Sequence, residues 1–252
     1  MKYILYKDIG ITSNDFAYQC KLSLNTNRLC YVGRLDPMAK GHMIILTDDD
    51  VKDMDRYIGN NKTYRFDIII GLSTVSGDIA SEIVDTLYIN DNDDNDILMN
   101  TIEDKISTFI KTYTIQKYHP ISSYMYRQGN IRKPLWWYTQ NNIQIDSIPK
   151  KRVDIHAHTI YTKKYIPVTD FNEDVKARLH TIKNSKTRKD LKIEKVMDFY
   201  NNVDNNSNSR YMSVEMEMSV SSGFYIRQFC VDFGEYIGYP CIAMDIHRIC
   251  IE

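Results

Sequence analysis

The chain has 252 residues, and its 32 lysines and arginines nearly balance its 33 aspartates and glutamates, giving a formal net charge of −1 at pH 7. This length can bury a sizeable core, and the balance argues against a uniformly basic coat protein for nucleic acid. The longest apolar runs, such as 43–46, are far shorter than the roughly 20 residues that cross a bilayer. Because the start carries no apolar leader, we expect an intracellular protein, in the cytoplasm. Its five cysteines then predict buried thiols rather than disulfides or a zinc site.

The first third of the chain predicts short strands and helices in alternation. In chain order we expect a strand over 1–6, a helix that begins at Thr12-Ser13, a loop over 29–42, a strand over 43–46, a helix over 50–58 and a strand over 64–72. In the last of these strands Tyr64, Phe66, Ile68 and Ile70 share one face.

The middle of the chain combines an acidic and an aromatic segment. Residues 85–104 hold seven acids and no Lys or Arg, which predicts a solvated loop that leads into an amphipathic helix over 97–113. His119-Pro120 ends that helix and opens an irregular segment through Pro149. Here Arg127, Arg132 and Lys133 alternate with flat rings, a pattern that suits unpaired RNA bases and phosphates but also occurs where aromatics pack on a core.

The last third holds a basic stretch over 175–195, with eight basic residues and two acids, a local charge of 8 − 2 = +6. It can be a solvated helical face or a grip for phosphates. A half-buried strand over 211–220, a helix over 226–237 and a final strand over 242–251 follow. With no internal repeat or low-complexity linker, we expect a single α+β domain over 1–252.

One loop carries the chemistry. Asp36 precedes a proline between Gly33 and Gly41, which places a carboxylate on a rigid loop. Alone, an Asp-Pro pair is an ordinary turn. However, four segments match in order the motifs of the TruB family of pseudouridine synthases, which this chain therefore resembles: Gly10-Ile11-Thr12-Ser13, Gly33–Gly41, Lys62-Thr63-Tyr64-Arg65-Phe66, and Ser221–Arg227 followed by Asp232-Phe233-Gly234-Glu235. Gln116–Ser123 is more weakly similar to the start of the family's RNA-clamping thumb.

The resemblance implies the pseudouridine synthase fold, a mixed, mainly antiparallel sheet flanked by helices, with a thumb-like RNA-binding segment over 116–149 and a basic insertion over 168–210. It implies isomerisation of uridine to pseudouridine, foremost of the T-loop uridine at position 55 of tRNA, without cofactor or metal. The expected partner is the tRNA T-arm or an RNA stem-loop like it, with no membrane and no obligate protein partner.

The resemblance also assigns site residues. Asp36 would act at the target ribose, Tyr64 would lie against the flipped uracil, and Arg227 would favour the ionised form of Asp36. Without the resemblance, Tyr64 would be an ordinary core aromatic. The remaining assignments are substrate contacts at Tyr225, Tyr31, Arg34 and Lys7, and RNA contacts at Arg127, Arg132, Lys133, Lys183, Lys186, Arg188 and Lys189.

The sequence departs from the family pattern in three ways. Tyr31 stands where the family commonly has histidine, and Asp8 follows Lys7 where it has proline. The sequence ends at Glu252, so we expect no C-terminal PUA domain and hypothesise that the basic insertion grips RNA instead. His156 and His158 could form half a metal site, but the sequence offers no further ligand.

Two alternatives remain open at this point. One is a non-catalytic RNA-binding protein or tRNA-folding chaperone that kept the fold. The other is a synthase that acts on mRNA stem-loops resembling a T-arm, because loop shape dominates RNA specificity.

Overall fold

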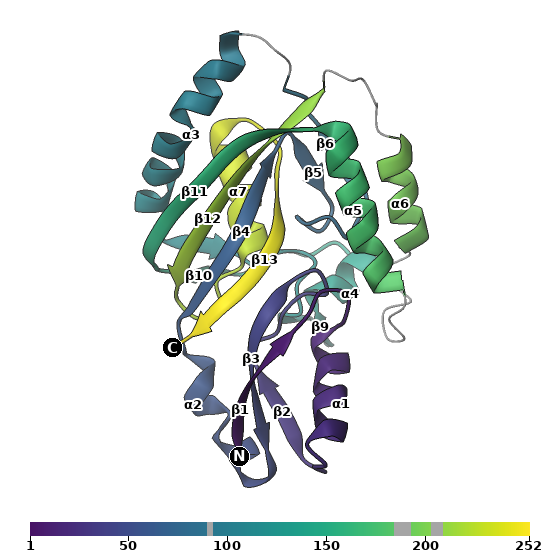
Figure 1. Ribbon diagram of the computed structural model, residues 1–252. Helices are drawn as coiled ribbons and strands as arrows, with labels where there is room; N and C mark the ends of the chain where they lie inside the picture. Colours follow the sequence, from purple (N-terminus) through teal and green to yellow (C-terminus); the bar gives the residue numbers. More distant parts are fainter. Residues whose placement is uncertain (90–92, 184–192, 203–208) are drawn as a thin grey trace.

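The computed structural model describes residues 1–89, 93–183, 193–202 and 209–252. Seven of the described strands form one sheet in the order β1-β3-β13-β4-β12-β11, with β2 also paired to β3 (Figure 1). Their bounds are β1 Lys2–Lys7, β2 Leu29–Val32, β3 Lys40–Thr47, β4 Lys62–Ile70, β11 Ile155–Pro167, β12 Arg210–Val220 and β13 Cys241–Ile251. All neighbours are antiparallel except β13 and β3. The mainly antiparallel α+β architecture is confirmed.

Helices cover both faces of this sheet. Helices α3 (Asp93–Thr112) and α7 (Ile226–Ile237) pack on one face, where Phe109 and Phe229 join Phe66 of β4 in the larger core cluster. Helices α5 (Val168–Lys183) and α6 (Ile193–Asn202) cover part of the other face through a second cluster that includes Phe171 and Tyr211. Both clusters include residues of β4 because alternate residues of a strand face opposite sides: Phe66, Ile68 and Ile70 lie in the larger cluster and Ile69 lies in the second.

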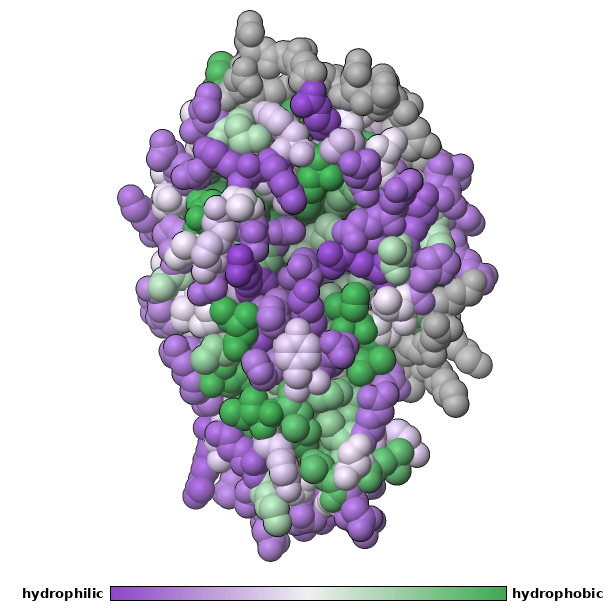
Figure 2. Space-filling model, viewed as in Figure 1, coloured by the Kyte–Doolittle hydropathy of each residue, from purple (hydrophilic) through white to green (hydrophobic). Residues whose placement is uncertain are grey.

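The rest of that second face is polar. Hydrophilic side chains cover most of the upper half of the view in Figure 2, whereas hydrophobic ones gather mainly lower down, around β1 to β3. Exposed apolar residues of this lower part include Ile4, Tyr6 and Leu22.

The approach of β13 to β3 depends on one glycine. A Cβ on Gly41 would lie 2.2 Å from the carbonyl oxygen of Arg248, and the φ of Gly41 is +125°. Only glycine has the conformational freedom and the size for this contact. Gly41, the second glycine of the Gly33–Gly41 motif, is therefore required for the pairing of β13 with β3 as well as for the loop before it.

The residues assigned to the thumb form a small unit that projects from the sheet. Strands β7 (Ile115–Lys117) and β10 (Lys150–Arg152) pair at its base. Between them lie the hairpin of β8 (Met125–Gln128) and β9 (Ile131–Pro134) and the short helix α4 (Leu135–Gln140). A second hairpin joins β5 (Leu72–Thr74) and β6 (Ile83–Thr86).

The expected strands over 1–6, 211–220 and 242–251, and the helices that begin near Thr12 and span 97–113 and 226–237, are confirmed within a few residues. Thr12 is the N-cap of α1 (Ser13–Ser23) and forms a capping box with Asp15. Gly238, in the left-handed region at φ +76°, ends α7.

Four expectations were wrong in detail. The expected loop over 29–42 contains β2 and the start of β3. The apolar residues of β2 pair with β3, although the nearby glycines favoured a loop. The irregular segment through Pro149 contains a hairpin and α4. The helix over 50–58 is instead a 3₁₀ turn, η1 (Asp48–Asp53), and a single turn, α2 (Asp55–Ile58). Among the cysteines, all free, Cys30 is half-buried and Cys250 is exposed rather than buried.

Parts of the charged segments lie outside the described residues. This applies to residues 90–92 of the acidic segment and to 184–192 of the basic stretch, whereas the backbone of 93–96 already belongs to α3. In the described part of the chain, no helix is long and apolar enough to cross a membrane.

Candidate active site

The side chains of Lys7 and Ser13 hold the backbone of the loop that carries Asp36. Lys7, fully buried, donates hydrogen bonds to the carbonyl oxygens of Asp8, Asp36 and Ala39 at 2.9, 3.2 and 2.6 Å. The Ser13 hydroxyl at the start of α1 donates to Leu35 O at 2.8 Å and accepts from Leu35 N at 2.9 Å. These contacts fix the backbone and leave the Asp36 carboxylate, which is 38% exposed, free to face a ligand.

Arg227 holds that carboxylate from the first turn of α7. Its Nε donates to Asp36 Oδ2 at 2.8 Å, Nη1 donates to Ser76 O at 2.5 Å, and Nη2 donates to Ile121 O at 3.3 Å. The arginine side chain is only 5% exposed. Because every nitrogen has a partner, the guanidinium has one orientation, and the carboxylate is oriented with it.

A second carboxylate, Asp78, shares the same arginine. Asp78 Oδ2 lies 3.7 Å from Arg227 Nε, and Oδ1 accepts from Ser76 Oγ at 2.6 Å and from Ala80 N at 3.0 Å. Burial raises the pKa of Asp78 and Arg227 opposes that shift. Sequence reasoning missed this residue, because the pairing spans 149 positions and a Ser-Gly-Asp turn carries no distinguishing local signal.

His119 is a further buried group behind Arg227. Its Nδ1 lies 3.1 Å from the backbone N–H of Ile121, from which it accepts a hydrogen bond. Burial, and then the charge of Arg227, hold its pKa well below the usual value. The imidazole is therefore neutral and supports the segment that binds Arg227 Nη2.

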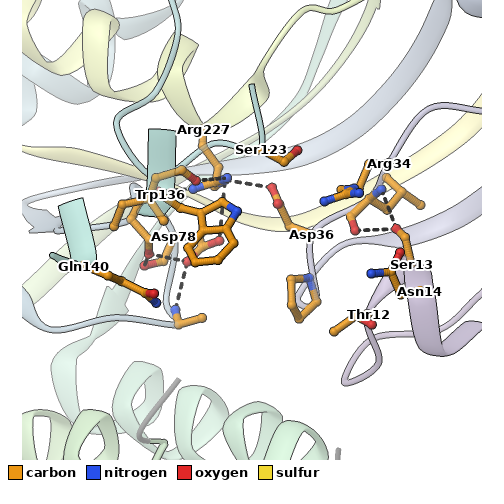
Figure 3. A pocket seen from close by; sticks show the side chains of 15 residues that line it. Thr12, Ser13, Asn14, Arg34, Asp36, Asp78, Ser123, Trp136, Gln140 and Arg227 are labelled. Atoms are coloured by element: carbon orange, nitrogen blue, oxygen red, sulfur yellow. Dashed lines mark hydrogen bonds and ion pairs between the residues drawn. The ribbon is translucent and has the colours of Figure 1, made fainter. Parts of the chain in front are cut away.

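Asp36 stands at the junction of two cavities. The tryptophan cavity, about 420 Å³, is lined by Trp136 and Gln140 of α4, Asn14 of α1, and Asp78 (Figure 3). Figure 3 shows Asp36 pointing toward Arg227, with Trp136 on one side and Thr12 and Asn14 on the other. The tyrosine cavity, about 270 Å³, is lined by Tyr64, Phe224 and Tyr225. Arg34, Leu35, Ser123 and Arg227 also line both cavities.

The two tyrosines of the tyrosine cavity come from separate elements. Tyr64, 7% exposed, lies on β4, and Tyr225 is the N-cap of α7. The side chain of Gln116 donates a hydrogen bond to Tyr225 O at 3.0 Å and accepts one from Tyr225 N at 2.9 Å. These two bonds connect the base of the small unit to the site. Burial, followed by the negative charge of Asp36, raises the pKa of Tyr225 to about 12, so its phenol stays protonated.

The structure thus brings together Asp36, Tyr64, Arg227, Tyr225 and Arg34. Lys7 and Tyr31, assigned above as substrate contacts, line neither cavity. Lys7 supports the loop from inside, and the Tyr31 hydroxyl donates to Asn14 Oδ1 at 2.6 Å. These contacts position neighbours of Asp36, and a substrate contact by either side chain stays a prediction.

The basic residues assigned to RNA lie apart from the cavities. Arg127 and Arg132 face each other across the β8–β9 hairpin, and Lys133 follows beside Trp137 with Nζ 5.7 Å from the ring centroid. All three are exposed. The side chain of Lys183 and the residues Lys186, Arg188 and Lys189 lie outside the described residues. His156 and His158 are exposed, and no metal-binding group of three ligands occurs in the described part of the chain.

The fold is that of a pseudouridine synthase. A solved structure titled "Crystal Structure of a Cbf5-Nop10-Gar1 Complex" matches 99% of this chain and 48% of its own, with a TM-score of 0.51 and 13% identity. The chain belongs to the TruB family: the model described as "TruB family pseudouridylate synthase (N terminal domain)" matches residues 21–178.

Bacterial proteins named tRNA pseudouridine synthase B are similar along almost all of this chain. That of Ligilactobacillus salivarius is 24% identical over 249 residues, which are 97% of this chain and 65% of the relative. That of Staphylococcus epidermidis is 30% identical over 248 residues, which are 97% of this chain and 64% of the relative. The chain thus spans somewhat less than two thirds of the length of these relatives.

Proposed function

We propose that this chain isomerises uridine to pseudouridine in RNA, with Asp36 acting at the target ribose. The observation that carries the proposal is the Asp36–Arg227 ion pair at the junction of two cavities, one of them walled by Tyr64 and Tyr225. A carboxylate fixed in this way can act as nucleophile or base at a sugar carbon. Membership of the TruB family supports the same chemistry.

The target nucleotide must leave its stack to reach Asp36, at a cost of a few kcal/mol. The tyrosine cavity offers aromatic walls for a flat base, which offsets part of that cost. The glycosidic C1′–N1 bond breaks, the uracil turns while it is held, and a C1′–C5 bond forms. Arg227 orients Asp36 throughout and belongs to the reacting site through that ion pair.

The proposed substrate is tRNA, in keeping with the name of the bacterial relatives, tRNA pseudouridine synthase B. Within tRNA, the proposed target is the T-loop uridine at position 55. The proposal treats residues 116–149 as an RNA-binding thumb and 168–210 as a basic insertion that adds phosphate contacts. The exposed Arg127, Arg132 and Lys133 support the first part, since like charges that face each other on a hairpin favour an anionic partner.

The test compares the unaltered protein with Asp36→Asn and with the exposed control Asp85→Asn. Each is incubated with T-arm RNA, and pseudouridine is mapped chemically. We expect product from the parent and the control, and a loss of at least about a thousandfold in Asp36→Asn, because the amide cannot act as nucleophile.

The outcome separates the alternatives. RNA binding by the parent without product would leave a non-catalytic RNA-binding protein. Product on an unrelated stem-loop but none on the T-arm would move the substrate to other RNAs.

A further inference from the structure

Two buried cations border the inner end of the tyrosine cavity. Lys62 is 6% exposed and Arg248 is fully buried, and both line the cavity together with Gly33. A Cβ on Gly33 would lie 3.2 Å from Arg248 Nη1 and 3.4 Å from Lys62 Cε. The two side chains therefore flank the same glycine, and its missing side chain leaves room beside both.

Neither cation has a carboxylate partner among the described residues. Lys62 donates to Asn60 O, and Arg248 donates to His42 O at 2.7 Å and to Gly33 O at 2.9 Å. These carbonyl groups accept hydrogen bonds from the two cations but do not neutralise their charges. The one acid that lines this cavity, Asp36, is bound to Arg227.

Two buried positive charges without a negative partner lower the stability of the folded protein. Burial, with the repulsion of Arg248 added, lowers the pKa of Lys62 to about 8. Buried charges without a counter-charge destabilise a fold unless a ligand supplies one. An anion that enters the tyrosine cavity would supply it.

The reaction proposed above produces such an anion inside that cavity. When Asp36 attacks C1′, a bond from its carboxylate oxygen to C1′ forms as C1′–N1 breaks, and the electron pair of C1′–N1 leaves on N1, so the detached uracil is negatively charged. When C1′–C5 forms, the ring gives that pair to the new bond, and the bond from Asp36 to C1′ breaks, which returns Asp36 as a carboxylate. The proton on C5 is then lost, and N1 takes up a proton. The charge therefore exists only between the two steps, and a preformed cationic site would stabilise it there.

We propose that Lys62 and Arg248 are catalytic residues that stabilise the detached uracil anion in the tyrosine cavity. This inference rests on the proposed function. The aromatic walls given by Tyr64 and Tyr225 fit a flat ring, whereas a backbone phosphate would meet the exposed cations, such as Arg34, before it reached this depth.

The experiment measures single-turnover isomerisation and RNA affinity for the parent, Lys62→Met, Lys62→Arg and the exposed control Lys111→Met. We expect Lys62→Met to isomerise about 10²-fold more slowly, with the Kd for RNA within about twofold of the parent. Lys62→Arg keeps the charge and recovers most of the rate. Lys111→Met, at the end of α3 and away from both cavities, behaves as the parent.

A second substrate separates charge stabilisation from a structural role. RNA with 5-fluorouridine at the target carries a fluorine that itself stabilises the uracil anion, and bond cleavage is followed as loss of 5-fluorouridine after nuclease digestion. The defect of Lys62→Met should shrink at least about threefold on this RNA, because a better leaving group depends less on the cation.

Three results would overturn the inference. They are an unchanged rate in Lys62→Met, an equal defect on both RNAs, or a weaker Kd with a salt slope lower by about 0.7–0.9, which would identify a phosphate contact. A parent that makes no pseudouridine would instead refute the proposed function, so the two failures are distinguishable.

Discussion

At the scale of single residues, the site is organised around Arg227. Asp36 and Arg227 were predicted from their motifs, and their 2.8 Å ion pair agrees with the predicted pairing. Asp36 is partly exposed, and Asp78, 8% exposed, is the buried carboxylate beside Arg227. Asp78 could not be predicted, because only the folded chain brings its turn beside α7.

This arrangement predicts the effect of Arg227→Ala. The variant should be inactive, because Asp36 loses its orientation, and less stable by about 3–5 kcal/mol, because Asp78 is left as an uncompensated buried charge. Urea unfolding and the pseudouridine assay measure the two effects. The double variant Arg227→Ala with Asp78→Asn is the control, and it should regain at least part of the stability while it stays inactive. Equal instability of the single and double variants would contradict the role given to Asp78.

At the scale of elements, strands and helices with clear periodicity were predictable and short paired elements were not. From Val214 to Val220 the alternation of β12 follows from its sequence, since buried apolar residues there alternate with less buried polar ones. Each strand of the β8–β9 hairpin has only four residues and carries an arginine, so no clear alternation of polar and apolar residues reveals it. The position of β13 between β3 and β4 could not be predicted, because strand order depends on contacts distant in sequence.

The carboxyl group of Asp67 on β4 allows a test of how charge affects the stability of the sheet. Burial, followed by the charges of Asp245 and Glu215, raises the pKa of Asp67 to about 6. The folded state therefore binds more protons than the unfolded state between about pH 4 and 6, and the free energy of unfolding falls as pH rises through that range.

Asp67→Asn removes this titration. We expect the variant to be more stable than the parent by about 1–3 kcal/mol at pH 7. The difference should shrink as the pH falls through about 6 and vanish below about pH 4, where the parent carboxyl becomes protonated in the unfolded state as well. Urea unfolding at several pH values measures the difference, and the exposed Asp85→Asn should show none. A difference that does not change with pH would contradict the assignment.

At the scale of the whole molecule, the near-zero net charge conceals an uneven distribution. The described part of the thumb-like segment presents Arg127, Arg132 and Lys133 on its surface, and the buried Lys62 and Arg248 add positive charge beneath Asp36. The sequence showed the clusters of charge along the chain, but not that Lys62 and Arg248, 186 positions apart, meet at Gly33.

Neutralising the hairpin should weaken RNA binding without regard to sequence. We expect Arg127→Gln with Arg132→Gln to lower the slope of log affinity against log salt by about one to two, and to leave the single-turnover rate of bound RNA unchanged. The hairpin itself should not suffer, since like charges opposite each other are removed. Binding titrations at three salt concentrations, with Lys111→Gln as the control, provide the measurement. An unchanged slope would show that phosphates bind elsewhere.

The position of β13 in the sheet affects when the site can fold during synthesis. This strand fills the gap between β3 and β4, and its Arg248 binds the carbonyl of Gly33. Until residues 241–251 leave the ribosome, the two halves of the sheet have no common neighbour, and the loop of Asp36 lacks one of its supports. The loop of Asp36 therefore completes its folding only after β13 has been made, and until then the apolar β3 and β4 of the nascent chain are open to contacts with other partners.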